Sequence, residues 1–200
     1  MDWENHYLDN DTPWDKGTAA PPLLEWIKAN PGIISGRVLI PGSGKGHDGV
    51  ALAELTDATQ VLGLDISPRA VELANLENGS DRFQSEVGDL FDLPVVHQSA
   101  FNWVWEHTCF CAIDPEMRDA YVEAVHLALK PEGQLLAVFY RDPYDEEHRP
   151  GEGPPHGTSL EELVELFEGS GRFQILESYV PETSYEGREG LEQVMRLRPL

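Results

Sequence analysis

Three glycines at alternate positions, Gly42, Gly44 and Gly46, lie between an apolar run at residues 38–40 and a helix-like segment at residues 49–55. Glycine has no Cβ and adopts backbone angles that other residues avoid, so such a turn lets the backbone approach a ligand closely. The next apolar run, residues 61–64, ends at Asp65, whose carboxylate could accept hydrogen bonds from both hydroxyls of a ribose. This is the layout of a nucleotide-type site at the first strand-to-helix crossing of a parallel sheet. We therefore predict an adenosine-bearing ligand.

Two phosphate-binding motifs do not fit this turn. The G-x-G-x-x-G motif of dinucleotide enzymes has a third glycine where this chain has His47. A Walker loop needs Ser or Thr after its Gly-Lys pair, whereas Lys45 is followed by Gly46. The turn therefore favours an adenosine ligand that is not held through its phosphates.

Apolar runs and helical segments alternate along most of the chain. We expect strands at residues 37–40, 60–64, 82–87, 101–106 and 134–140, and helices at residues 21–29, 49–55, 67–77, 114–129 and 159–167. A turn at residues 130–133 precedes the strongest strand, and two further strands, at residues 173–180 and 191–197, close the chain. This order predicts a doubly wound, Rossmann-like α/β sheet, mostly parallel, with a C-terminal antiparallel hairpin. Residues 1–200 are expected to form one domain, in which residues 1–30 supply an N-terminal segment and helix.

The composition limits the partners that the protein could have. The 200 residues are 40% hydrophobic and carry a net charge of −22, which repels phosphate backbones and anionic membranes. No apolar run approaches the roughly 18 residues that a membrane span needs. The acidic start is not typical of a signal peptide. We expect a cytoplasmic monomer that binds neither nucleic acid nor membrane.

Two cysteines, Cys109 and Cys111, lie in an apolar segment. On a strand their side chains would share one face, which is a poor arrangement for a disulfide, and a single C-x-C pair is weak support for a metal site. We interpret them as reduced core thiols and predict no bound metal. His148 and His156, in the polar loop at residues 142–157, have no further metal ligands near them in the sequence.

Four elements follow one another along the chain: the G-x-G-x-G turn, the acid after the second strand, a further acid in Gly88-Asp89-Leu90, and the turn Leu129-Lys130-Pro131-Glu132-Gly133. In this order they resemble the class I S-adenosylmethionine-dependent methyltransferases. The resemblance implies that S-adenosylmethionine is the cofactor. It implies cofactor contacts from the turn and from the ends of the strands, namely Gly42, Gly44, Asp65, Ile66, Asp89, Leu90, Glu106 and His107.

The chain also contains longer motifs: Trp3-Glu4, the Thr-Pro-Trp-Asp-Lys-Gly of residues 12–17, the Pro-Gly-Ser-Gly-Lys-Gly-His-Asp of residues 41–48, the Phe-Cys-Ala-Ile-Asp-Pro-Glu-Met-Arg of residues 110–118, and Gly153-Pro154-Pro155. These motifs resemble the thiopurine S-methyltransferase family, and its halide and thiol methyltransferase branch in particular. The chain departs from the family pattern at Tyr7, where a tryptophan is usual, and at Ser43, where a cysteine is usual. It also has Glu106-His107 where the halide branch commonly has Asp-Tyr.

The family resemblance implies that Trp3, Tyr7 and Trp14 form a lid over the methionine portion of the cofactor, although the three could simply anchor the N-terminal segment. Asp65 and Asp89 could alternatively be helix caps. On the acceptor side we predict Arg118, as a cation that favours a thiolate, and Tyr140 at the end of the strong strand. Arg118 could instead form a surface ion pair. His107 could be a polar residue at the rim or could shuttle a proton.

The predicted activity is methyl transfer to a small soft nucleophile, namely a thiol or thiolate, bisulfide or halide ion. Such an acceptor is a small molecule, and the loop at residues 142–157 could close over it. Alternatives are an O- or N-methyltransferase of a small metabolite, a cofactor-binding protein without catalysis and, more distantly, an NAD-dependent oxidoreductase.

Overall fold

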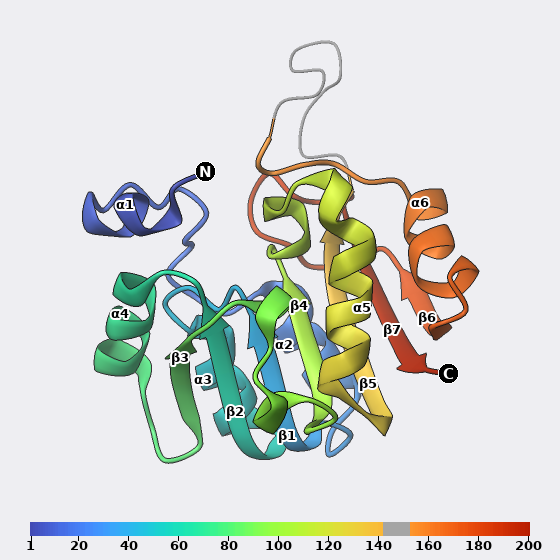
Figure 1. Cartoon of the computed structure of the whole chain (residues 1–200), viewed down its shortest axis with the longest axis horizontal. Coiled ribbons are helices and arrows are strands. Elements are labelled where there is room, and N and C mark those ends of the chain that lie inside the picture. Colours follow the sequence, from blue (N-terminus) through green and yellow to red (C-terminus); the bar gives the residue numbers. More distant parts are fainter. Residues whose placement is uncertain (142–152) are drawn as a thin grey trace.

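A seven-stranded sheet in the order β3-β2-β1-β4-β5-β7-β6 organises the computed structural model, which describes residues 1–141 and 153–200 (Figure 1). The strands are β1 (Ser35–Pro41), β2 (Asp57–Asp65), β3 (Phe83–Val87), β4 (Phe101–His107), β5 (Leu129–Tyr140), β6 (Phe173–Tyr179) and β7 (Glu192–Pro199). β7 lies between β5 and β6 and is antiparallel to both, whereas the pairs from β3 to β5 are parallel. The predicted sheet, mostly parallel with a closing antiparallel pair, is confirmed.

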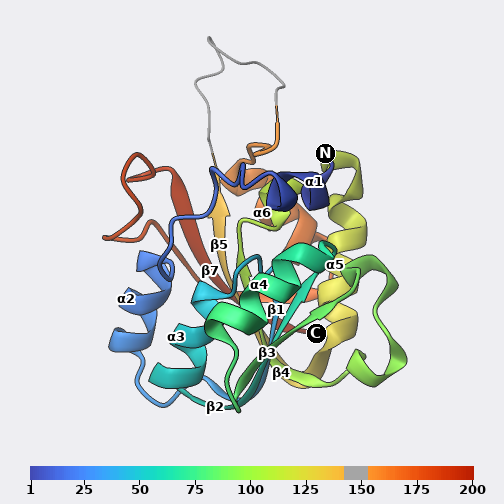
Figure 2. The ribbon, with the colours of Figure 1, turned by 90° about the vertical axis from the view of Figure 1, so that its left-hand side faces the viewer.

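Helices cover both faces of the sheet (Figure 2). On one face lie α2 (Pro21–Ala29) and α3 (His47–Leu55), with α4 (Pro68–Asn78) beside α3. On the other face lie α5 (Arg118–Ala128) and α6 (Leu160–Val164), the latter continued by a π-helical turn at Glu165–Gly169. Each face has its own buried core. One contains Phe110, Tyr121, Phe139, Phe167 and Phe173, and the other contains Leu23, Trp26, Leu52, Phe83, Trp103 and Trp105.

Three parts of the chain differ from the sequence-based expectations. The N-terminal segment contains a short helix, α1 (Trp3–Leu8), which begins where the Asp2 carboxylate accepts a hydrogen bond from the Asn5 N–H. The helix expected from residue 114 instead starts as a 3₁₀ turn at Pro115–Met117 and becomes α5 afterwards. The remaining 3₁₀ turns are Leu90–Asp92, Val95–His97 and Phe110–Ala112. The predicted turn at residues 130–133 lies within β5, and the predicted acceptor-side loop falls largely on residues 142–152, outside the described residues.

An irregularity in the β4–β5 pairing sets which side chains of β4 face each core. Phe101 pairs with Leu129, but Trp103 pairs with Gln134, so residues 130–133 are accommodated without regular pairing to β4. A bulge interrupts the alternation of faces along a strand. Phe101 therefore packs against the α5 side, while Trp103 packs against the α2 side.

The order of the strands fixes where a ligand can bind. β1 and β4 are neighbours, and the chain leaves β1 for α3 on one face and β4 for α5 on the other. The crevice at the carboxyl ends of two such strands is the usual ligand site of a doubly wound sheet. Among the described helices, none is both long and apolar enough to cross a membrane.

We expect Gly49→Ala to lower the free energy of unfolding by about 2 kcal/mol, because extra volume in a packed core typically costs 1–3 kcal/mol. A Cβ on Gly49, in the first turn of α3, would lie 2.3 Å from Cε2 of the fully buried Phe83. Urea denaturation would measure the loss. Gly169→Ala is the control, because the nearest atoms to its Cβ would be those of the exposed carboxylate of Glu165, which can move aside. Equal stabilities of the two variants would contradict the tight packing at Gly49.

Candidate active site

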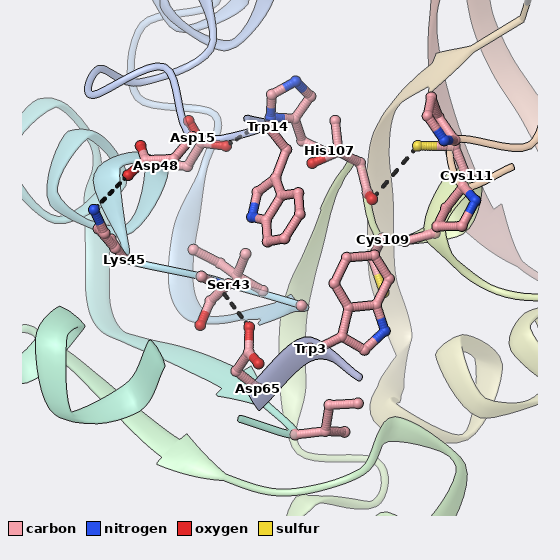
Figure 3. A pocket seen from close by; sticks show the side chains of 18 of the residues that line it. Trp3, Trp14, Asp15, Ser43, Lys45, Asp48, Asp65, His107, Cys109 and Cys111 are labelled. Carbon is pink, nitrogen blue, oxygen red and sulfur yellow. Dashed lines mark hydrogen bonds and ion pairs between the residues drawn. The ribbon is translucent and has the colours of Figure 1, made fainter. Parts of the chain in front are cut away.

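A cavity of about 650 Å³ opens at the carboxyl ends of β1, β2 and β4, beside α1 (Figure 3). This volume is within the range of small-molecule sites. Most of the residues predicted from the sequence line it: Trp3, Tyr7, Trp14, Gly42, Gly44, Asp65, Ile66, Asp89, Leu90, His107 and Tyr140. Glu106 and Arg118 are outside the lining that the described residues form.

The glycine turn needs glycine for both conformation and space. Gly42 and Gly44 have φ values of +58° and +52°, in the left-handed region that other residues rarely adopt. A Cβ on Gly42 would lie 3.1 Å from the side chain of Cys109, and one on Gly44 would lie 2.8 Å from the Tyr7 hydroxyl. The turn thus leaves room for the cavity beside its backbone.

Asp65 joins the glycine turn to the start of α4. Its Oδ2 accepts a hydrogen bond from the Gly44 N–H at 2.8 Å, and its Oδ1 accepts one from the Ser67 N–H at 2.9 Å. Burial raises the pKa of this carboxyl, and these two N–H groups offset only part of the increase. The cap of α4 is Ser67, whose Oγ accepts from the Ala70 N–H, so Asp65 is not that helix's cap.

Asp89 follows β3 on the same side of the cavity. Its carboxylate accepts a hydrogen bond from the Phe91 N–H at 2.9 Å, so it does cap the 3₁₀ turn at Leu90–Asp92. It also lines the cavity together with Ile66 and Leu90. Two carboxylates separated by apolar side chains suit a nucleoside, with a polar sugar and a flat base.

The N-terminal aromatic side chains both anchor α1 and line the cavity. Tyr7 is buried, packs with Ala70 and Leu73 of α4, and accepts a hydrogen bond from Trp14 Nε1 at 3.2 Å. The rings of Trp3 and Trp14 meet edge to face, with centroids 5.1 Å apart. Lid and anchor are therefore compatible roles for these residues.

Hydrogen bonds to Glu4 hold α1 over the site, and ion pairs of Asp15 hold the segment after it. The Glu4 carboxylate accepts hydrogen bonds from Ser67 Oγ and, at 3.0 Å, from the Arg69 N–H at the start of α4, where a negative charge is favourable. Asp15 lies 2.8 Å from Lys45 Nζ and 3.0 Å from His47 Nε2, both in the glycine turn or just after it. Burial alone would raise the pKa of Asp15, but Lys45 and His47, with the Gly17 N–H, lower it. This link was not predicted from the sequence, although Asp15 stands in the Trp-Asp-Lys-Gly motif.

The far end of the cavity contains an aromatic and basic group. The Arg188 guanidinium lies over the Tyr140 ring, 4.8 Å from its centroid, and is 5.6 Å from the centroid of Tyr185. Arg188 also pairs with Glu192 at 3.4 Å. Sequence reasoning missed Tyr185 and Arg188, because the segment between β6 and β7 contains no recognisable motif.

His107 and Asp48 form a hydrogen-bonded pair in the cavity wall. Asp48 Oδ2 lies 3.2 Å from His107 Nδ1 and accepts a hydrogen bond from Trp105 Nε1 at 2.8 Å, while Oδ1 accepts one from the Ala20 N–H at 2.7 Å. Burial would raise the pKa of Asp48, but the hydrogen bond and charge of His107, with the two N–H donors, lower it. Asp48 stands in the predicted family motif, but its partner is identified only by the fold.

Arg118 and Glu106 lie behind the cavity wall. Arg118 is 3% exposed, donates to Glu162 and to the Gly157 carbonyl, and lies over the Phe110 ring. It thus forms an ion pair, as the alternative interpretation expected, but a buried one. Glu106 is fully buried and accepts hydrogen bonds from the Phe110 N–H and the Tyr121 hydroxyl. Neither placement brings the side chain to the cavity surface.

The two cysteines lie after the end of β4 and not on a strand. β4 ends at His107, the positive φ of Thr108 turns the chain, and Cys109 and Cys111 follow in the 3₁₀ turn region. Both are free thiols and both line the cavity. Burial raises both pKa values, that of Cys111 to about 12, so the two thiols stay protonated at neutral pH. Within the described residues, no cluster of three or more His, Cys, Asp or Glu side chains could hold a metal ion.

Comparison with known proteins gives a consistent picture. The family model described as Thiopurine S-methyltransferase (TPMT) matches residues 1–195. Thiocyanate methyltransferase 1 of Brassica oleracea is 36% identical over an alignment 150 residues long, which covers 69% of this chain and 61% of that protein. The probable thiol methyltransferase 2 of Arabidopsis thaliana is 31% identical over 206 residues, covering 97% of this chain and 83% of that protein.

The matches differ in how much of each protein they cover. The chain spans about three fifths of the length of the thiocyanate methyltransferases of Brassica oleracea and Arabidopsis thaliana. One solved structure is Burkholderia thailandensis 1,6-didemethyltoxoflavin-N1-methyltransferase with bound S-adenosylhomocysteine. It superimposes with a TM-score of 0.71 at 19% identity and covers 99% of this chain and 85% of that one. At this identity the likeness supports the fold alone. The match over residues 1–195 decides the family: this chain belongs to the thiopurine S-methyltransferase family.

Proposed function

We propose that the protein transfers a methyl group from S-adenosylmethionine to a small soft nucleophile of the thiol or halide type. The observation that carries this proposal is that one cavity combines the Asp65 carboxylate, beside a glycine turn, with the rings of Trp3, Tyr7 and Trp14. A carboxylate suits a ribose, and aromatic faces suit a sulfonium cation. The names of the relatives point to the same chemistry.

The residues present fit this cofactor. Asp65 would accept hydrogen bonds from the ribose hydroxyls, and Asp89 with the backbone of Leu90 would hold the adenine. Trp3, Tyr7 and Trp14 would surround the methionine portion, where a desolvated cation–π contact contributes about 2 kcal/mol. S-adenosylmethionine supplies a methyl group already activated by its positive sulfur.

The remaining task of the protein is to align the acceptor and exclude water. Tyr140 and Arg188 would do this at the acceptor end, where the guanidinium offers a local positive charge within a chain of net charge −22. We assign to Arg188 the acceptor-side role that the sequence suggested for Arg118. The buried contacts of Arg118 with Glu162 and Gly157 make it a positioning residue for the segment that leads to α6.

We further propose that residues 1–200 act as one domain and as a cytoplasmic monomer whose acceptor is a small molecule. The net charge of −22 opposes self-association and binding to nucleic acids or anionic membranes.

The proposal is tested by a headspace assay for methyl iodide and methanethiol, run beside a thiophenol and a thiopurine assay, with S-adenosylmethionine as donor. We expect methylation of at least one of these acceptors, and titration calorimetry should detect S-adenosylhomocysteine binding. Binding without transfer to any thiol, halide or small metabolite would favour a non-catalytic binding protein. Transfer only to oxygen or nitrogen would favour an O- or N-methyltransferase, and no binding would refute the whole proposal.

A further inference from the structure

We infer that His107, oriented by Asp48, is the base that takes the proton from a thiol acceptor, so that the acceptor enters as a neutral thiol. This inference rests on the proposed methyl transfer and narrows its substrate class. A halide ion carries no proton and would gain nothing from such a base. The pair therefore points to thiol methylation as the activity for which this cavity is built.

The pair combines two elements that meet at the site. Asp48 comes from the first turn of α3, directly after the glycine turn, and His107 is the last residue of β4. Their side chains are 15% and 10% exposed, and Oδ2 of Asp48 lies 3.2 Å from Nδ1 of His107. The Trp105 indole and the Ala20 N–H fix the carboxylate in place. A base on such fixed elements is held in one orientation.

The hydrogen bond determines which ring nitrogen can accept a proton. Because the pKa of Asp48 is lowered, its carboxylate is ionised at neutral pH and can only accept hydrogen bonds. Nδ1 of His107 must therefore carry a proton, and Nε2 of the neutral ring carries the lone pair. Nε2 is buried and has no hydrogen-bond partner among the described residues. A buried acceptor without a partner is costly unless a ligand completes it.

The cavity around His107 suits a thiol. The ring lies 6.0 Å from the ring of Tyr185, centroid to centroid, and Tyr140 and Arg188 line the same end of the cavity. The aromatic rings offer polarisable surface to sulfur. The Arg188 guanidinium supplies positive charge near the point where a thiolate would form, which favours ionisation of the thiol.

A second histidine shows that the pairing alone does not make a base. The side chain of His97 is also 10% exposed, its Nε2 lies 3.1 Å from Glu86 Oε2, and its buried Nδ1 has no hydrogen-bond partner in the part of the chain that the structure describes. It is nevertheless outside the lining that the described residues give the cavity. What distinguishes His107 is its position in the cavity wall, and His97 thus provides a matched control.

The proposed step balances in a simple way. The thiol proton passes to Nε2 of His107, and the electron pair of the S–H bond stays on the acceptor sulfur. That sulfur forms the new bond to the methyl carbon while the bond from the methyl carbon to the sulfonium sulfur breaks, its electron pair remaining on the leaving thioether. The imidazolium, stabilised by Asp48, then returns its proton to water.

The test compares His107→Gln with the wild type on two acceptors, 2-mercaptoethanol and iodide. Glutamine can still donate to Asp48 but cannot act as the base. We expect kcat/KM for 2-mercaptoethanol to fall about 100-fold or more, since general base catalysis typically contributes 10²–10⁴-fold. Any methylation of iodide should stay within about threefold of its wild-type rate. His97→Gln should change neither rate.

The other outcomes separate this inference from the proposed function. An equal loss with both acceptors would mean a structural role, and a larger loss with iodide would mean that His107 acts as an anion-binding cation. Both of these results would overturn the inference and leave the methyltransferase proposal standing. The same holds if His107→Gln methylates the thiol at the wild-type rate, or if the wild type methylates iodide but no thiol. If the wild type binds S-adenosylhomocysteine but methylates nothing, the proposed function itself fails. Calorimetry with S-adenosylhomocysteine verifies that His107→Gln is folded.

Discussion

Asp65→Ala is expected to weaken the binding of S-adenosylhomocysteine by about 100-fold or more. The carboxylate lies at the end of β2 in the cavity lining, with one oxygen bound to the Gly44 N–H of the glycine turn and the other to the Ser67 N–H at the start of α4. Hydrogen bonds to charged groups contribute about 1.5–3 kcal/mol each. Two ribose hydroxyls bound to one carboxylate therefore account for at least about 3 kcal/mol, which corresponds to about 100-fold in Kd. Titration calorimetry measures this loss directly.

A control is needed because Asp65 also binds its own backbone. Removing the carboxylate leaves the Gly44 and Ser67 N–H groups without an acceptor, which costs stability, so unfolding in urea should be followed for the variant. Asp92→Ala removes an equal charge from an exposed side chain outside the cavity lining. It should bind the ligand as the wild type does. If Asp65→Ala also bound within threefold of the wild type while fully folded, the proposed cofactor position would be wrong.

The cofactor side of the site could be predicted from the sequence because its signals are local. Gly42 comes directly after β1, Asp65 is the last residue of β2, and Asp89 comes two residues after β3. The apolar runs of β1 and β2 are visible in the sequence. In a parallel sheet such positions meet at one edge. The aromatic residues were found through their motif, although α1 was not, because six residues are too few to show a helical period.

The acceptor side depends on contacts that no local pattern records. Arg188 reaches Tyr140 because β7 inserts between β5 and β6, which brings the β6–β7 connection to the end of β5. The motif arginine, Arg118, instead follows a 3₁₀ turn into α5 and pairs with Glu162 of α6. The choice between the two arginines is made by the strand order.

Glu106 and His107 illustrate a signal that could have been used. Neighbouring residues on a strand point to opposite faces of the sheet. Glu106 therefore faces Tyr121 of α5, and His107 faces Asp48 of α3. The alternation alone implied that the two side chains would not share one environment, but only the fold shows which of them meets the cavity.

Glu106 should make the stability of the protein depend on pH. Complete burial raises the pKa of its carboxyl from the ordinary 4.5 to about 7, against the opposing hydrogen bonds from the Tyr121 hydroxyl and the Phe110 N–H. Between these two values the unfolded chain loses the proton and the folded chain keeps it. The free energy of unfolding therefore falls as pH rises from about 4.5 to about 7, and the stabilisation present below 4.5 is lost above 7. At about 1.4 kcal/mol per pKa unit, the change is on the order of 3 kcal/mol.

Glu106→Gln should remove this dependence, because the amide is neutral at every pH and its oxygen can still accept from the Phe110 N–H. Relative to the wild type, the variant should gain on the order of 3 kcal/mol in unfolding free energy between pH 4.5 and pH 8, as measured by urea denaturation. The exposed Glu116 gives the control, since Glu116→Gln removes the same charge without burial and should follow the wild-type curve. A difference between Glu106→Gln and the wild type that is constant with pH would show that the buried carboxyl does not titrate in this range. Glu106 accepts a hydrogen bond from the first residue of the turn that starts at Phe110 and places Cys111 in the cavity wall. In that case, the stability of this turn would not depend on the protonation of Glu106.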